Sequence, residues 1–253
     1  MKNLSNQNIQ HVMTDVVDYL RFSVFDEFGV IAIDAIKGRY DSNYVGDEQD
    51  TNFRALCNEL DISFDNLVRI EQQVHSDICM RIDSANDSPS RCDALIADVP
   101  GIALITREAD CVPILIYDPV KKAIANVHSG WRGTVRHIVA RTIEKMQLEY
   151  GSNPHDLVCA LLPSIGMDHF VVHDDVREPF MREFDAPKIK DLGNGEYLID
   201  AAASVKEDLQ KAGVVAENIY DSGICTTCEA DQIHSCRGGA GKKRNAALIY
   251  IKN

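Results

Sequence analysis

Two short apolar segments joined by a tight turn constrain the fold of this chain more than any other feature. Residues 112–117 and 123–127 are each long enough for a buried strand, and Asp118-Pro119 supplies the turn between them. Similar apolar runs recur at residues 67–70, 102–106, 157–162 and 246–251. Because helical patterns are interspersed among these runs and no linker or internal repeat separates them, we expect one domain over residues 1–253 with mixed strands and helices.

Helical spacing of apolar residues predicts the other elements. Helices are expected over residues 1–20, from Asp50 or Thr51 to Leu60, from Thr134 to Gly151, over residues 176–184, and from Asp200 to Lys211. The first rests on Val12, Val16, Val17 and Leu20, which fall on one side of a helix. Residues 22–36 are expected to form two strands joined by a turn, and Gly193-Asn-Gly195 a hairpin.

The charge and the apolar pattern exclude several classes of partner. The net charge is −13, from 26 basic and 39 acidic residues, which disfavours nonspecific binding to nucleic acid or to an anionic membrane. No stretch approaches the roughly 20 apolar residues that span a bilayer, and residues 1–30 do not resemble a secretory signal. We therefore expect a cytoplasmic protein, with a monomer as the simpler oligomeric state.

A thiol and an imidazole flank the two strands of the central pair. Cys111 precedes the first strand, His128 follows the second, and another imidazole, His75, lies upstream. One cysteine and two histidines can hold a zinc ion that keeps one open position. The separations of 36 and 17 residues differ from the tight spacing of a zinc finger, so the fold would have to assemble the site. Each residue taken alone is equally compatible with a purely structural role.

Copper is the alternative metal for the same three ligands. An electron-transfer copper site also uses one cysteine and two histidines. A copper oxidase needs many more imidazoles, usually in His-x-His pairs, whereas this chain has eight histidines and no such pair. We therefore predict zinc at His75, Cys111 and His128 and consider copper the weaker choice.

The segment after His128 has the pattern of an anion site. Ser129-Gly-Trp-Arg-Gly-Thr134 joins a strand to a helix, where backbone amides and the planar fork of Arg132 suit phosphate or carboxylate. A helix cap with a surface arginine is the structural alternative. Asp110, beside Cys111, is a candidate to orient a ligand or move a proton, and capping a backbone amide explains it equally well.

The C-terminal region holds a second group of cysteines. Cys225-Thr-Thr-Cys228, with His234 and Cys236 nearby, has the composition of a second zinc site, although two reduced loop cysteines are the expected reading. Residues 238–244 are glycine-rich and basic but lack the spacing of a phosphate-binding P-loop. This loop is still suited to close over an anionic or ribose-bearing ligand.

Several of these segments together resemble a known family. Gln73-Val-His75, Ala109-Asp-Cys-Val-Pro113 and His128-Ser-Gly-Trp-Arg-Gly-Thr134 are similar to motifs of the YfiH-type family, also called laccase-domain or multicopper polyphenol oxidase-like proteins. Weaker likenesses follow in order along the chain, at Val45-Gly-Asp, Asn52-Phe-Arg54, Cys92-Asp-Ala-Leu-Ile, Pro163-Ser-Ile-Gly, Cys225-Thr and the Arg237–Arg244 loop. The resemblance covers most of the chain.

The resemblance implies a fold and a function. The fold would be α/β, a layered sandwich of mixed β-sheets flanked by helices and related in shape to a toxin deamidase. The function would be that of a zinc-dependent purine nucleoside enzyme that phosphorolyses adenosine, inosine and methylthioadenosine and deaminates adenosine. Its small-molecule partners would be the nucleoside and phosphate. Some members are instead described as peptidoglycan-precursor editing amidases, and a protein that binds zinc or nucleoside without turnover is the third alternative.

The resemblance also assigns roles to residues. His75, Cys111 and His128 match the family's metal ligands, and Arg132 matches its arginine after Gly-Trp. The catalytic set expected here is therefore Asp110, Cys111, His128 and Arg132, and the substrate-binding set is Gln73, Arg132, Arg237 and Arg244. The chain departs from the family pattern at residues 22–29, Leu162, Cys236-Arg237 and Lys242-Lys243. These departures affect the expected substrate surround and leave the metal trio intact.

Overall fold

Two six-stranded sheets packed face to face form the centre of the molecule. The computed structural model describes residues 1–252. The first sheet has the order β1 (Ile9–Met13), β2 (Asp18–Phe22), β3 (Val30–Ala35), β15 (Asn245–Ile251), β7 (Ala103–Glu108), β4 (Leu67–Arg69). The second has the order β14 (Ile219–Asp221), β10 (Val158–Leu161), β8 (Val112–Asp118), β9 (Ala123–Ser129), β6 (Ala94–Ala97), β5 (Cys79–Arg81). Both sheets are mixed, because β4–β7, β10–β14 and β5–β6 pair in parallel and the other pairs are antiparallel.

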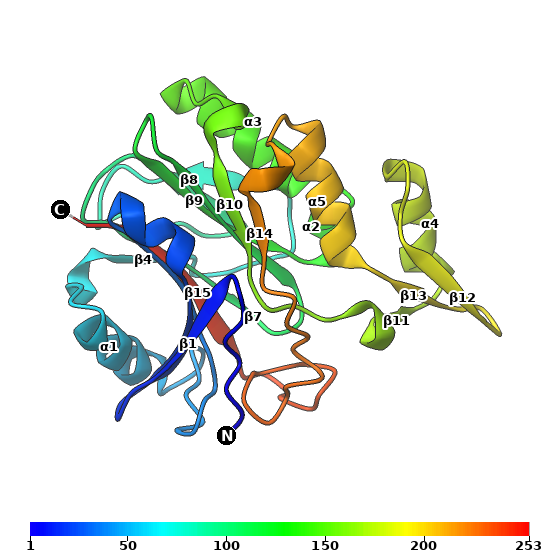
Figure 1. Cartoon of the computed structure of the whole chain (residues 1–253), viewed down its shortest axis with the longest axis horizontal. Helices are drawn as coiled ribbons and strands as arrows, with labels where there is room; N and C mark the ends of the chain where they lie inside the picture. The colour runs from blue at the N-terminus through cyan, green and yellow to red at the C-terminus, as the bar shows by residue number, and fades with distance from the viewer. Residues whose placement is uncertain (253) are drawn as a thin grey trace.

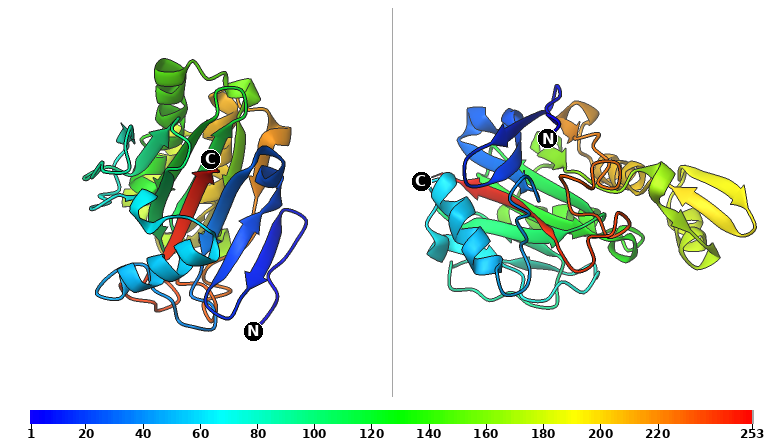
Figure 2. Two further views of the ribbon diagram at one scale, coloured as in Figure 1. Left: turned by 90° about the vertical axis from the view of Figure 1, so that its left-hand side faces the viewer. Right: turned by 90° about the horizontal axis from the view of Figure 1, so that it is seen from below.

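Helices cover the outer face of each sheet. On the first sheet, α1 (Gln49–Glu59) packs with Phe53 and Leu56 against the strands, and on the second, α3 (Ile138–Tyr150) and α5 (Ala201–Lys211) do the same. The short α2 (Trp131–Thr134) precedes α3. The 3-10 helices are η1 (Ser23–Phe28), η2 (Phe64–Asn66), η3 (Pro154–Asp156), η4 (Met167–His169) and η5 (Ala216–Asn218). Figures 1 and 2 show the resulting four layers.

A small third sheet extends from this body. It consists of β11 (Val171–Val172), β13 (Glu196–Ile199) and β12 (Ile189–Gly193), and α4 (Asp174–Glu183) lies beside it. The right-hand view of Figure 2 shows it projecting away from the two large sheets. None of the helices among residues 1–252 has both the length and the apolar character needed to cross a bilayer.

Successive side chains along a strand point to opposite faces of the sheet, so each large sheet packs into a different core on each of its two faces. Along β8, Leu115 and Tyr117 enter the core between the sheets, whereas Ile114 and Ile116 pack beneath α3 and α5. The strand β15 alternates in the same way between the central core and the layer under α1. The mixed α/β class and the layered architecture predicted from the sequence and the resemblance are therefore confirmed.

Most elements predicted from local patterns are present. The central pair forms β8 and β9, and α1, α3 and α5 lie where their spacing places them. The oxygen Oδ1 of Asp200 accepts a hydrogen bond from the backbone of Ala203 at 2.9 Å, so the predicted N-cap of α5 is correct.

The predicted N-terminal helix is wrong. Residues 9–13 and 18–22 form the antiparallel pair β1–β2 instead. The hydroxyl of Thr14 accepts hydrogen bonds from the amides of Val16 and Val17, which turns the chain in the middle of the expected helix. Two strands were also expected in residues 22–36, but only the second is present, as β3. In place of the first, the chain forms the 3-10 helix η1.

Candidate active site

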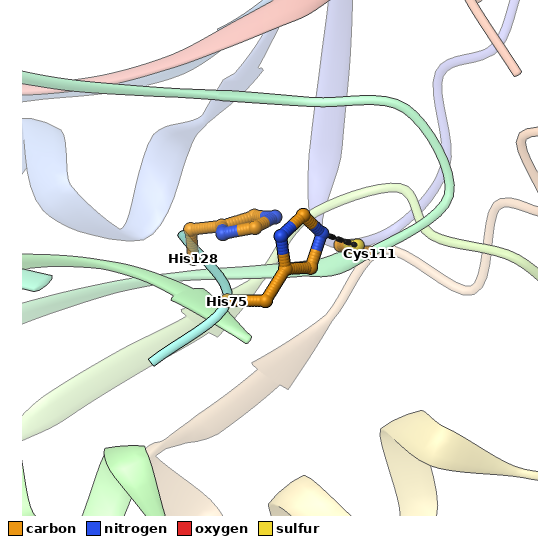
Figure 3. Close-up of side chains that lie close together, drawn as sticks. All are labelled: His75, Cys111 and His128. Carbon is orange, nitrogen blue, oxygen red and sulfur yellow. Dashed lines mark hydrogen bonds between the residues drawn. The ribbon is translucent and has the colours of Figure 1, made fainter. Parts of the chain in front are cut away.

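The two large sheets and their connecting loops bring one thiol and two imidazoles together. Antiparallel pairing of β8 with β9 sets Val112 opposite Ser129, so Cys111 and His128 lie at the same end of the hairpin. His75 reaches this point from the loop between β4 and β5. One ligand atom from each residue lies within 4.8 Å of those of the other two, and Cys111 Sγ is 3.8 Å from His75 Nε2 (Figure 3).

These distances suit a tetrahedral metal site. Zinc–sulfur and zinc–nitrogen bonds of about 2.3 and 2.1 Å place neighbouring ligand atoms about 3.6 Å apart. The His75 and His128 rings meet nearly edge to face, with centroids 4.9 Å apart (Figure 3). Three donors converging on one point, one of them a thiol, fit a single zinc ion with an open position.

One buried carboxylate, Asp93, positions both histidines. Its Oδ1 is 2.9 Å from His128 Nδ1, which leaves Nε2 of that ring for the cluster. The same carboxylate accepts hydrogen bonds from the consecutive backbone amides of Val74, His75 and Ser76 at 3.2, 3.0 and 2.6 Å. These bonds hold His75 in a left-handed backbone conformation with φ of 57°. Sequence analysis missed Asp93, although it directly follows Cys92 in a family-like segment.

The electrostatics of the cluster favour an ionised sulfur. Burial raises the pKa of the Cys111 thiol, but the His128 and His75 rings outweigh burial and lower this pKa to about 6. Burial lowers the pKa of His128, and Cys111 and Asp93 outweigh it and raise this pKa to about 10. Because metal ions bind the thiolate form of cysteine, a sulfur that ionises below neutral pH is prepared for coordination.

Gly130 makes room for the cluster. A Cβ at this position would lie 2.4 Å from His75 Cδ2 and 3.2 Å from Cys111 Sγ. The φ of Gly130 is −70°, which any residue adopts, so the requirement for glycine is one of space.

We expect Gly130→Ala to lower metal affinity at least about tenfold, because His75 has to move away from Cys111. Titration with zinc against a competing chelator measures the effect. Far-UV circular dichroism and the unfolding temperature of the metal-free protein serve as controls for folding. An alanine variant with the affinity of the wild type would show that the two rings do not need their positions next to Gly130.

The cluster lies on the wall of a cavity of about 470 Å³. The cavity is also lined by four of the residues predicted to serve catalysis or substrate binding, Gln73, Asp110, Arg237 and Arg244. Gln73 is held by two hydrogen bonds of 2.9 Å with the backbone of Arg107. Both carboxylate oxygens of Asp110 are engaged, one by Thr226 Oγ1 at 2.6 Å and one by the backbone amide of Arg237 at 2.8 Å.

Arg132 is the one predicted site residue that does not line this cavity. It is exposed in a separate concavity with Arg136, Arg141 and Arg182. Its guanidinium lies over the ring of Trp131, 4.3 Å from the centroid. Trp131 lines both concavities, so its indole lies between the main cavity and the concavity that holds Arg132. The positive charge of the cavity comes instead from Arg107, Arg237 and Arg244.

A pair of buried carboxyl groups, Glu108 and Asp34, lies at the cavity wall. Glu108, at the end of β7, lines the cavity, and it interacts with Asp34 on β3. Burial raises the pKa of Asp34 to about 8, and burial together with the charge of Asp34 raises the pKa of Glu108 well above its ordinary value. The raised pKa favours the protonated form of Glu108, which is almost fully buried beside the cavity. Sequence analysis missed this pair, whose only signal is an acidic residue inside an apolar strand.

This pair makes a testable contribution to stability. A carboxyl whose pKa is raised on folding binds a proton in the folded state that the unfolded chain has lost, so stability falls as pH rises from about 4 to about 8. We expect Asp34→Asn to reduce the slope of the unfolding free energy against pH by up to about 1.4 kcal/mol per pH unit, which corresponds to one bound proton. Urea unfolding between pH 5 and 9 measures it, with the exposed Asp65→Asn as matched control. Parallel curves for wild type and Asp34→Asn would contradict the assignment.

Comparison with known proteins identifies the family of the chain. Residues 40–252 match the family described as "Multi-copper polyphenol oxidoreductase laccase". A purine nucleoside phosphorylase of Bacteroides thetaiotaomicron is 38% identical over 148 residues, covering 57% of this chain and 55% of the relative. Adenosine deaminase RL5, from an unknown prokaryotic organism, is 32% identical over 88% of this chain and 95% of its own length. The chain spans about half the length of the Bacteroides and human phosphorylases that it matches.

Solved structures agree with this relationship. A YfiH protein of Bacillus licheniformis superposes with a TM-score of 0.87 at 24% identity, covering 98% of this chain and 100% of the other. YlmD of Geobacillus stearothermophilus gives a TM-score of 0.85 at 24% identity, over 96% and 99% of the two chains. At this identity the likeness establishes the fold alone. Together with the family match, it shows that the chain belongs to the laccase-like family described as multi-copper polyphenol oxidoreductase laccase, which includes the YfiH proteins.

Proposed function

We propose that the protein is a zinc-dependent purine nucleoside enzyme that phosphorolyses adenosine, inosine or methylthioadenosine and deaminates adenosine. The observation that carries the proposal is the convergence of His75, Cys111 and His128 on the wall of a cavity large enough for a small molecule. The names of the relatives, purine nucleoside phosphorylase and adenosine deaminase, support this choice of substrate class.

The donor set is suited to a single zinc ion. His75, Cys111 and His128 would hold it, and Asp93 would orient the two histidines. A zinc ion at this position would supply Lewis acidity at the cavity wall. The eight histidines of the chain include no His-x-His pair, the usual arrangement in a multi-copper oxidase centre, which favours zinc over such a centre.

The cavity has separate surfaces for a base and for an anion. Phe170, Trp131 and Ile165 form an apolar wall against which a purine ring can pack. Arg237 and Arg244, from the glycine-rich loop near the C-terminus, bring positive charge and the planar fork that matches phosphate. We assign phosphate binding to these two arginines in preference to Arg132, which faces the neighbouring concavity.

Proton transfer falls to Glu108 in this proposal. Phosphorolysis forms a bond between phosphate oxygen and the ribose carbon C1′ and breaks the bond from C1′ to the base, whose nitrogen then needs a proton. Glu108 lines the cavity, and its raised pKa favours the protonated form, which suits a general acid. Asp110 is less available for this role, because Thr226 and the Arg237 amide engage both of its oxygens.

Metal analysis combined with assays in the presence and absence of phosphate tests the proposal. The purified protein should contain zinc, release hypoxanthine from inosine only when phosphate is present, and release ammonia from adenosine without it. If the protein binds metal but forms no product from either nucleoside, the proposed enzyme activity is contradicted, and the protein would be one that binds zinc or nucleoside without turnover. Release of an amino acid from a muramyl precursor, followed by mass spectrometry, would show an editing amidase instead.

A further inference from the structure

A second cluster of metal-binding side chains lies outside the cavity. Within the described residues, His169, Cys225 and Cys228 are the other group whose ligand atoms all lie within 4.8 Å of one another. His169 Nε2 is 3.2 Å from Cys228 Sγ, close to the separation of about 3.6 Å between ligand atoms in a tetrahedral zinc site. None of the three residues lines the cavity of about 470 Å³.

The cluster joins two segments that are far apart in the sequence. His169 ends the 3-10 helix η4, in the connection from β10 to β11, whereas the cysteines lie in the turn after β14. The two segments are held together by a parallel bridge between Ser164 and Cys225, with the amide of Thr226 donating to the carbonyl of Ser164 at 3.0 Å. The ligands are therefore positioned by backbone pairing and not only by flexible side chains.

The backbone also solvates one of the sulfurs. The amide of Gly166 donates a hydrogen bond to Cys225 Sγ at 3.2 Å. A Cβ at position 166 would lie 3.1 Å from this sulfur, so glycine allows the close approach. A Cys-x-x-Cys pair with a distant histidine is a ligand set that zinc uses.

The sequence analysis grouped Cys225 and Cys228 with His234 and Cys236, but the structure places these last two side chains in other contacts. His234 is buried, and its Nε2 lies 2.7 Å from the carbonyl oxygen of Ser42. The thiol of Cys236 faces the carbonyl of Gly241 at 3.8 Å. His169 takes their place, 56 positions before Cys225, and nothing local in the sequence associates the two.

From this geometry we infer that His169, Cys225 and Cys228 form a second zinc site, distinct from the cluster at Cys111. Its fourth position is open to water or to an external ligand. The bound ion pins the β10–β11 connection to the turn that contains the two cysteines. The first segment lines the cavity through Ile165 and Phe170. Thr226 of the second segment donates a hydrogen bond to Asp110, which lines the cavity next to Cys111. The second ion thus has a structural role in holding the cavity wall.

Counting bound metal in matched variants tests this inference. The full chain is kept reduced with a phosphine, loaded with zinc, freed of excess metal and analysed by mass spectrometry of the element. We expect the wild type to carry one zinc ion more than Cys225→Ser/Cys228→Ser and one more than His169→Asn. The matched controls Cys236→Ser and His155→Asn should retain the wild-type content. The difference of one ion decides the question, whatever the first cluster binds.

Alkylation locates the ion and separates a metal site from a redox pair. Bound zinc should protect Cys225 and Cys228 from iodoacetamide, while the exposed Cys236 is modified with or without zinc. Equal zinc content in the wild type and in the folded cysteine variant would overturn the inference. So would alkylation of Cys225 and Cys228 that is unaffected by zinc, or their recovery as a disulfide from the reduced, zinc-loaded protein. Circular dichroism of each variant confirms that the comparison is made on folded protein.

Discussion

Replacing His128 with alanine should remove the metal from the Cys111 cluster and lower both nucleoside activities by at least about a hundredfold. The ring contributes one of three ligand atoms, and two remaining protein ligands do not make a stable zinc site. Zinc content is best measured in the Cys225→Ser/Cys228→Ser background, where the second cluster cannot contribute. Phosphorolysis and deamination are then followed with inosine and adenosine.

The same substitution also affects folding, and the experiment has to separate the two effects. His128 is 3% exposed, and its loss leaves Asp93 buried without its ring partner, at a cost of about 3 kcal/mol. His128→Gln keeps a side-chain amide that can bond Asp93, so it should fold better while still losing metal and activity. His155→Ala, on the surface, controls for removal of an imidazole. Full turnover in folded His128→Gln would refute the assignment of this residue.

Asp93→Asn should weaken zinc binding by about 10- to 100-fold without removing any ligand. The carboxylate fixes the orientation of the His128 ring and the backbone at His75, and an amide reproduces only part of its acceptor capacity. We expect lower activity at limiting zinc that excess zinc partly restores. Titration of the metal-free protein with zinc against a chelator measures the affinity.

A control in the same loop distinguishes orientation of the ligands from general loosening. Asp77, whose carboxylate pairs with Arg141 at 3.1 Å, lies two residues beyond His75, and Asp77→Asn should leave zinc affinity unchanged. The unfolding free energy of both variants is measured in the absence of metal. If Asp93→Asn binds zinc as tightly as the wild type, the carboxylate does not orient the ligands.

The sequence predictions were correct where the deciding interactions join neighbouring residues, and they failed where pairing between distant segments decides. The helices α1, α3 and α5 were predicted because their apolar spacing and end signals lie within the helices themselves. The N-terminal segment has similar spacing, yet Thr14 turns the chain and pairing with β3 decides for strands. Tertiary pairing overrides a helical pattern when no cap or long repeat supports it.

The same distinction applies to the candidate site. The motifs around Cys111 and His128 were recognisable because a single hairpin carries them, and its register needs only a short turn. Asp93 and Glu108 gave no such signal. The sequence does not show which group faces a carboxylate that lies in an apolar strand, as Glu108 does, or just before one, as Asp93 does. The structure shows whether that group is a histidine, another acid or water.

The sequence by itself determined the hairpin that carries Cys111 and His128, the periodic helices, the acidic net charge and the family motifs. Only the tertiary structure decided that Asp93 serves both histidines, that Arg132 lines a neighbouring concavity, and that His169 meets Cys225 and Cys228. Hydrophobic period and capping act over a few neighbouring residues and can be read from them. Contacts between residues 36 or 56 positions apart depend on strand order and on the packing of two sheets, which no local pattern specifies.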